Sequence, residues 1–165
     1  MNQEHVLFWT KIKNFELDDP DVDFSFSDRL ARENGWSIEF ALRAIEEYKK
    51  FMFLISVCKE PLTPSDQVDQ VWHLHLIYTH SYWEEFCGEI LGHPVHHGPT
   101  KGGNQERNKY VNLYQNTLMR YKHYFGYEAP KDIWPESSIR FSEIEFRRVN
   151  MNRYWVISKF HRLKK

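Results

Sequence analysis

Apolar side chains recur every three or four residues along most of this chain. The segment between Ser37 and Pro61 shows the pattern most clearly. Its apolar positions are Phe40, Leu42, Ala44, Ile45, Tyr48, Phe51, Met52 and Ile55. This spacing predicts one face of an α-helix that has Ser37 as its N-cap and ends by about Lys59, before Pro61.

The same spacing predicts four further helices. They cover residues 4–14, 28–33, 65–91 and 104–125. Ser27 and Ser65 stand where an N-cap is expected, and Gly92 and Gly126 stand where the last two of these helices would end. No repeat, linker or low-complexity tract divides the chain. We therefore predict a mainly α, single-domain bundle of about five helices over residues 1–165.

The C-terminal tail, residues 136–165, departs from this pattern. Two stretches, 146–149 and 154–157, are rich in aromatic and β-branched residues, which favour extended structure. A continuing helix is the alternative. We predict an irregular or strand-like tail packed on the bundle. Its tryptophan, tyrosine and arginine residues are also typical of a protein interface.

Composition narrows the class of protein further. Hydrophobic residues make up 41% and charged residues 27% of the chain, which favours a folded core over disorder. A formal net charge of -1 gives no basic excess for binding nucleic acid or an anionic membrane. The longest apolar run, from Phe51 to Cys58, is far shorter than the ~20 residues of a membrane span. With two cysteines and no signal-peptide pattern, we expect a cytoplasmic protein.

Histidine clustering is the most informative feature of the sequence. Six of the nine histidines lie between positions 73 and 97. At about 100° per residue, Asp69 and His73 share one edge of the helix predicted to carry them. Carboxylate and imidazole ligands suit a divalent metal, zinc first and iron or manganese as alternatives. Because a metal needs a further ligand, we expect His96 or His97, in the loop after this helix, to complete the site.

His75 points away from these ligands. It lies two positions after His73, which is about 200° around a regular helix, and so it faces the apolar interior. One hypothesis is a core histidine that is hydrogen-bonded to a buried tyrosine, threonine or backbone carbonyl. The other is a metal ligand or catalytic base, since a distorted helix would let both histidines reach one ion. Asp69 and His73 by themselves also fit an ordinary surface ion pair.

A glycine-containing loop precedes the last predicted helix. Lys101, Gly102 and Gly103 would bring backbone amides and one positive charge to a phosphate or carboxylate group. We predict that this segment binds an anionic group of a substrate beside the metal. An ordinary flexible connection is the alternative.

The central motif resembles a known family. The motif is Asp69-x-x-Trp72-His73-x-His75, followed by Thr79, Tyr82, Phe86-Cys87 and a His-His-Gly-Pro-Thr loop. It is similar to the bacterial relatives of the glycine-rich domain-containing protein family, over about residues 35–135. The resemblance implies that His75 belongs with Asp69 and His73, and that His80, which falls on the same helix edge as His73, is a surface residue. With seven glycines, this chain lacks the glycine-rich extension of the plant members.

Two functions are consistent with these features. The first is a small metal-dependent enzyme that acts on a small-molecule substrate, with hydrolysis as the expected reaction and His75 as a ligand or catalytic base. A metal with an open coordination position would activate water for this reaction. The second is a non-enzymatic protein-interaction module. In that case the histidines form a structural hydrogen-bonded core and the aromatic, basic tail binds a protein partner.

Overall fold

The chain forms seven helices and no strand within residues 1–98, 104–142 and 149–157, which are the residues described by this computed structural model. The helices are α1 (Gln3–Lys13), α2 (Phe26–Asn34), α3 (Ile38–Val57), α4 (Asp66–Ile77), η1 (Ser81–Leu91), α5 (Asn104–Phe125) and α6 (Ser137–Arg140). The prediction of a mainly α bundle is confirmed.

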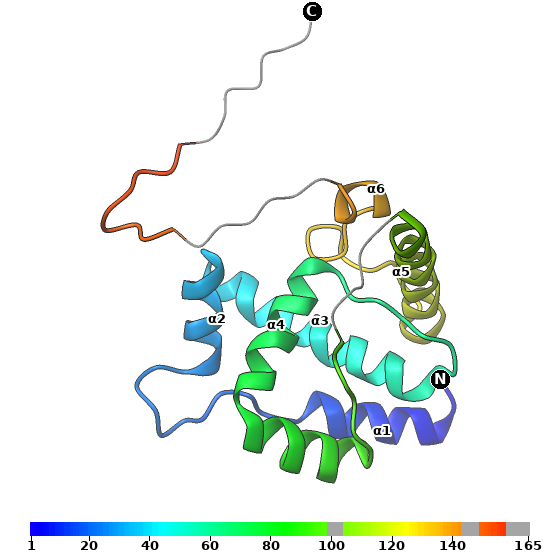
Figure 1. Cartoon of the computed structure of the whole chain (residues 1–165). Coiled ribbons are helices and arrows are strands. Elements are labelled where there is room, and N and C mark those ends of the chain that lie inside the picture. The colour runs from blue at the N-terminus through cyan, green and yellow to red at the C-terminus, as the bar shows by residue number, and fades with distance from the viewer. Residues whose placement is uncertain (99–103, 143–148, 158–165) are drawn as a thin grey trace, which may run out of the picture.

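Helix α3 is the central element of the bundle. Helices α1, α2, α4 and α5 all contact it, and Figure 1 shows them arranged around its length. Its side chains are buried on more than one face, including Phe51, Met52, Phe53 and Leu54, each with no exposed area. A helix that is apolar nearly all round is stable only when its neighbours cover it on several sides, so α3 organises the other helices.

Helix caps fix where the elements begin. The side-chain oxygens of Ser37 and Ser65 accept hydrogen bonds from the backbone N–H groups of Phe40 and Val68, which confirms both predicted caps. The predicted cap at Ser27 is wrong. Helix α2 begins two residues earlier, because Ser25 forms a capping box with Asp28. Ser27 is buried inside the helix instead.

The predicted single helix over 65–91 is two helices, and that prediction is corrected here. Helix α4 ends at Ile77, Tyr78 adopts φ -82° and ψ 66°, and η1 continues as a π-helix from Ser81. The Tyr78 angles match the low-energy inverse γ-turn, so the change of direction costs little strain. The break lets η1 contact both α1 and α4, and the Tyr78 ring packs on Phe26 at 5.3 Å between ring centroids.

A buried polar network joins α3 to the C-terminal half of the chain. The Glu47 carboxylate accepts hydrogen bonds from the Trp134 indole at 2.8 Å, the Tyr121 hydroxyl at 3.1 Å and the Lys50 ammonium at 2.7 Å. The carboxylate is 6% exposed, so these three donors replace the water that it loses on folding.

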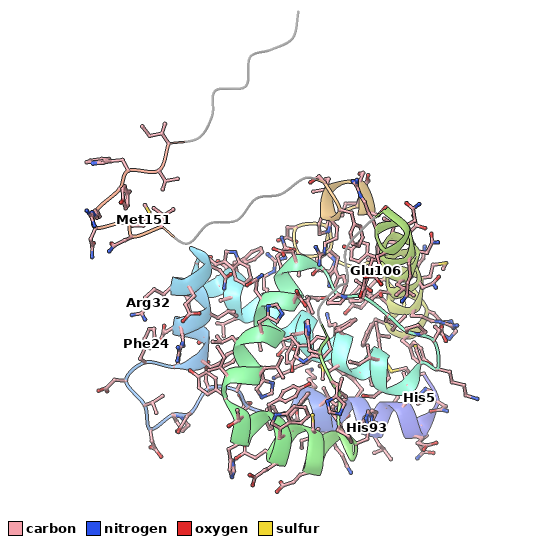
Figure 2. The ribbon with its side chains drawn as sticks, in the orientation of Figure 1. His5, Phe24, Arg32, His93, Glu106 and Met151 are labelled. Carbon is pink, nitrogen blue, oxygen red and sulfur yellow. The ribbon has the colours of Figure 1, made fainter. Side chains whose placement is uncertain are left out.

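The two described parts of the C-terminal tail differ: residues 136–142 include the short helix α6 and pack on the bundle through Phe141, whereas residues 149–157 do not pack on it, contrary to the prediction. Residues 149–157 are exposed, with Trp155 94% accessible, and Figures 1 and 2 show this segment standing away from the helices, with Met151 at its start. The stretch 154–157 is irregular and not a strand. The other predicted extended stretch, 146–149, lies mostly outside the described residues. That the segment binds a protein partner stays a prediction.

Among the described helices, none combines the length and the apolar character that crossing a membrane requires.

Replacing Trp134 by Phe should destabilise the protein by about 1–3 kcal/mol, because one oxygen of the buried Glu47 carboxylate loses its donor. Urea unfolding followed by circular dichroism measures the change. Trp155→Phe, at a side chain 94% exposed, is the matched control and should change the free energy of unfolding by less than about 0.5 kcal/mol. Equal midpoints for the two variants would contradict the structural role of the network.

Candidate metal centre

Three side chains with metal-ligating atoms converge at the outer surface of α4. Asp69, His73 and His97 each place one such atom within 4.8 Å of the others. The His97 Nε2 atom lies 2.8 Å from one Asp69 oxygen, and the His73 Nε2 atom lies 3.8 Å from the other. The group is half sheltered, since Asp69 is 18% exposed, His97 19% and His73 50%. Such a group is open to a ligand from solvent.

Helix geometry accounts for two of these residues. Asp69 and His73 are four positions apart on α4, so their side chains lie one turn apart on the same face. Ser65 caps this helix four positions before Asp69, which fixes where the helix begins and therefore the face on which both residues lie.

The third residue comes from the loop after η1 and is held by a chain of hydrogen bonds. The Trp72 indole N–H donates to the Tyr82 hydroxyl at 2.8 Å, and that hydroxyl donates to the Val95 carbonyl at 2.5 Å. The His97 ring then lies between its neighbours, 4.4 Å from the Trp72 ring and 4.6 Å from the His73 ring between centroids. Trp72 therefore positions the loop as well as filling the core.

These separations suit a small divalent cation. Ligands at about 2.1 Å in tetrahedral geometry are separated from one another by about 3.4 Å. The two carboxylate–imidazole separations, 2.8 Å and 3.8 Å, lie on either side of that value. The three side chains therefore already lie near the spacing that a single ion requires.

A metal would replace a hydrogen bond at this site. In the metal-free arrangement the His97 Nε2–H donates to Asp69, because a carboxylate can only accept. A metal held at Nε2 would require the neutral tautomer that carries its hydrogen on Nδ1, so the ion would take the place of the His97–Asp69 hydrogen bond.

A second carboxylate lies close to the three ligands. Asp66 begins α4, one turn before Asp69. Burial raises the pKa of the Asp66 carboxyl, the charge of Arg140 opposes the rise, and the charge of Asp69 adds to it. The extra negative charge favours a cation at the centre. In the sequence, Asp66 and Asp69 are three positions apart, a spacing that places both on one side of a helix, but Asp66 was not among the predicted site residues.

His75 is not brought to this group. It has no exposed area, and its Nδ1 atom lies 2.9 Å from the Tyr48 hydroxyl on α3. The other nitrogen, Nε2, lies 3.4 Å from the Ser81 hydroxyl. Residues 73 and 75 point in opposite directions because α4 is regular up to Ile77 and the distortion comes only afterwards. Of the three kinds of partner predicted, a buried tyrosine, a threonine or a backbone carbonyl, the structure shows a buried tyrosine.

Burial also sets the charge state of His75. Loss of hydration lowers its pKa from 6.5 to about 3, so the imidazole is neutral at neutral pH.

The remaining predicted site residues lie elsewhere. His96 is exposed and its ring faces Trp83 at 5.4 Å between centroids, so the structure does not bring it to Asp69. His80, predicted by helix geometry to share an edge with His73, follows the break at Tyr78 and pairs with Glu84 and Glu85. It is a surface residue, as the resemblance implied.

Lys101, Gly102 and Gly103 lie outside the described residues. Their predicted anion-binding role therefore stays a prediction. Tyr82, in contrast, is a positioning residue that the sequence reasoning counted only as core. The Tyr82 hydroxyl lies on a mainly apolar helix face, and a buried hydroxyl of this kind needs a hydrogen-bond partner, which could have indicated its role.

Comparison with known proteins identifies the family of the chain. The pattern that defines the UCP032817-like family matches residues 27–121, more than half of the sequence. The chain belongs to the UCP032817-like family. The resemblance to the glycine-rich domain-containing family is therefore wrong, because no such family is found. No curated protein and no solved structure matches the chain.

The matched region of this UCP032817-like protein contains Asp69, His73, His75 and His97 together with the Trp72–Tyr82 pair. It leaves out α1 and everything after Tyr121. The family description names no activity, so the function has to be argued from the site itself.

The burial of His75 predicts a pH dependence of stability. The folded state keeps His75 neutral down to about pH 3, whereas the unfolded chain binds a proton at about pH 6.5. The contribution of neutral His75 to the free energy of unfolding is therefore fully present above pH 6.5 and is lost progressively between pH 6.5 and pH 3. Between pH 7 and pH 5, the free energy of unfolding should fall by about 2 kcal/mol more in wild-type protein than in His75→Gln.

Urea unfolding in the presence of EDTA measures this difference without any contribution from metal binding. His93→Gln, at an exposed histidine of the same region, serves as the control and should keep the wild-type dependence. Equal losses in wild-type protein and His75→Gln would show that His75 takes up its proton in the folded state.

Proposed function

We propose that this UCP032817-like protein binds one divalent metal ion through Asp69, His73 and His97, with zinc as the preferred ion. The observation that carries the proposal is the convergence of three ligand atoms within 4.8 Å on a sheltered surface. Two imidazoles and one carboxylate form a donor set that zinc readily accepts. Iron and manganese are the alternatives, since two histidines and a carboxylate also bind Fe(II).

We further propose that the metal serves hydrolysis. Asp69, His73 and His97 would hold zinc through three protein ligands, as in catalytic zinc sites, which would leave a position for water. A zinc ion would lower the pKa of such a water to about 7 and so supply hydroxide at neutral pH. The exposed His73 side of the group gives a substrate access to this position. Trp72 and Tyr82 hold His97 in place, as residues behind a metal ligand commonly do.

An ordinary ion pair is the competing interpretation of the same geometry. A half-exposed carboxylate–imidazole pair contributes about 0–1 kcal/mol and needs no metal to explain it. The arrangement of two imidazoles on one carboxylate, with a further acidic side chain at Asp66, favours the metal.

Metal analysis tests the first proposal directly. Protein purified without an affinity tag, loaded with zinc and desalted, should retain about one ion per chain and melt at a higher temperature than the EDTA-treated form, because the ion binds only the folded state. His73→Ala and His97→Ala should lose both the retained zinc and the shift in melting temperature.

His80→Ala and His96→Ala are the matched controls, because they remove exposed histidines that lie outside the three-ligand group. Both should bind zinc as wild-type protein does. If all four variants bind zinc alike, or if wild-type protein retains none, the proposed centre is wrong. Circular dichroism of each metal-free variant checks that it is folded.

Hydrolysis needs a separate measurement. With para-nitrophenyl acetate as a general ester probe, the zinc-loaded protein should release nitrophenolate at a rate that rises with pH through about 7, the region in which zinc-bound water ionises. EDTA and His73→Ala should each remove this activity. A rate unaffected by either would assign the ester cleavage to another group and would leave the protein a metal-binding protein only.

A further inference from the structure

Charge is distributed unevenly along this chain. Residues 146–165, called the basic segment below, contain seven lysines and arginines and no aspartate or glutamate. Residues 1–145 contain fifteen basic and twenty-three acidic residues. The formal net charge of -1 therefore combines +7 on the basic segment with -8 on the rest of the chain. Since the net charge describes neither part, the binding properties of each have to be considered separately.

The basic segment also presents apolar side chains to water. Every residue from 149 to 157 is exposed, and the accessible fraction is 94% for Trp155, 78% for Ile157, 67% for Met151 and 63% for Val156. Figure 2 shows the side chains of this stretch clear of the helices. Nine of the twenty residues of the segment are aromatic or apolar. Apolar side chains that gather on an exposed stretch mark a place where another surface binds.

The helices of the same chain do not provide that surface. The backbone hydrogen bonds that the described stretch makes are local, because the N–H groups of Arg153 and Tyr154 both donate to the Asn150 carbonyl. Figure 1 shows residues 149–157 away from the bundle, although the bundle carries the opposite charge. The binding partner of the segment therefore lies outside this bundle.

The composition of the segment distinguishes three classes of anionic partner. Nucleic acid uses basic and aromatic side chains, but it offers little to the exposed aliphatic residues Val156 and Ile157. Protein interfaces favour tryptophan and arginine but are depleted in lysine, of which the segment has three. A membrane surface accommodates every kind of residue present. Lysine and arginine pair with anionic headgroups, tryptophan and tyrosine lie at the interface, and aliphatic side chains enter the edge of the acyl region.

We propose that the basic segment binds the surface of a membrane that contains anionic lipids. Trp155, Val156 and Ile157 enter the boundary between headgroups and acyl chains, while Arg153 and Lys159 on either side of them pair with the headgroups. The same surface repels the negative charge of residues 1–145. The helical part therefore stays in water, where salt screens the repulsion beyond about 10 Å. The proposal uses no residue of the metal centre and does not rest on the proposed metal function.

Co-sedimentation of the full-length protein with lipid vesicles tests the proposal. EDTA is present throughout, so that no divalent ion can bridge the protein to the lipid. In about 0.1 M NaCl the protein should bind vesicles of phosphatidylcholine with about 30% phosphatidylserine. It should bind pure phosphatidylcholine about tenfold or more weakly, because the charge attraction is lost. Raising NaCl to about 0.5 M should also weaken binding to the anionic vesicles about tenfold or more.

The apolar contribution is tested by Trp155→Ser combined with Ile157→Ser. Both side chains are largely exposed, so the double variant leaves the core unchanged. It should bind the anionic vesicles about tenfold or more weakly than wild-type protein, because less apolar area enters the membrane. Leu7→Ser combined with Met119→Ser, at side chains each 62% exposed on α1 and α5, is the matched control and should bind as wild-type protein does.

The charge contribution is tested by Arg153→Glu combined with Lys159→Glu. This variant should also bind the anionic vesicles about tenfold or more weakly. Lys11→Glu combined with Lys131→Glu changes the net charge of the chain by the same amount at exposed positions of the helical part. It should weaken binding less than about threefold, because those charges lie away from the membrane and are screened. Circular dichroism checks that all four double variants are folded.

Four results would overturn the proposal. The first is no binding of wild-type protein to the anionic vesicles. The second is wild-type binding by the Trp155/Ile157 variant, which would exclude insertion of the apolar side chains. The third is an equal loss in the two charge variants, which would assign the attraction to the net charge of the chain. The fourth is binding of single-stranded DNA but not of vesicles, which would assign the basic segment to nucleic acid.

Discussion

The buried hydrogen bond between Tyr48 and His75 fixes how α4 sits against the central helix α3. Both side chains have no exposed area and lie in an apolar core, so either one alone would be an unsatisfied polar group. Any rotation of α4 about its axis breaks the bond. The faces of α4 are thereby assigned: His75 inward, and Asp69 and His73 outward. The grouping of Asp69, His73 and His97 depends on this setting although His75 takes no part in it.

Trp72 connects the two faces of α4. Its ring is buried in the core against Phe51, at 5.8 Å between centroids, and its indole N–H reaches Tyr82 on η1. Through Tyr82 and the Val95 carbonyl it holds the loop that carries His97, and the edge of its ring supports the His97 imidazole. A core residue therefore places His97 beside Asp69 and His73.

The sequence predicted the parts of this structure that follow from local chemistry. Regular periodicity placed α3, serine caps placed the starts of α3 and α4, and a spacing of two placed His73 and His75 on opposite faces. The break at Tyr78 was missed because it has no proline or glycine to announce it. In η1 the buried residues Tyr82, Phe86, Cys87 and Leu91 recur at a spacing that an α-helix gives equally well, so the pattern could not reveal the π-helix. The choice of His97 over His96 was not predictable, because it depends on the Tyr82–Val95 bond.

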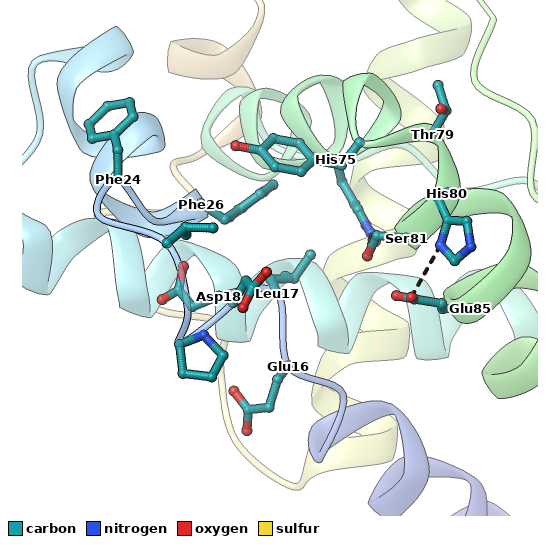
Figure 3. Close-up of a pocket in the computed structure, with 14 residues that line it drawn as sticks. Glu16, Leu17, Asp18, Phe24, Phe26, His75, Thr79, His80, Ser81 and Glu85 are labelled. Atoms are coloured by element: carbon teal, nitrogen blue, oxygen red, sulfur yellow. Dashed lines mark hydrogen bonds and ion pairs between the residues drawn. The ribbon is translucent and has the colours of Figure 1, made fainter.

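The break at Tyr78 shapes both sides of α4. A straight continuation of α4 would carry Tyr82 along the axis of the helix, away from the Trp72 indole, and the loop with His97 would lose its anchor. The same continuation would remove the junction that forms one wall of a surface pocket, where Tyr78, Ser81 and Glu85 meet the loop from α1 (Figure 3). Because the turn at Tyr78 uses low-energy backbone angles, the chain changes direction there without stored strain. One turn therefore sets the position of His97 on one face of α4 and the lining of the pocket on the other.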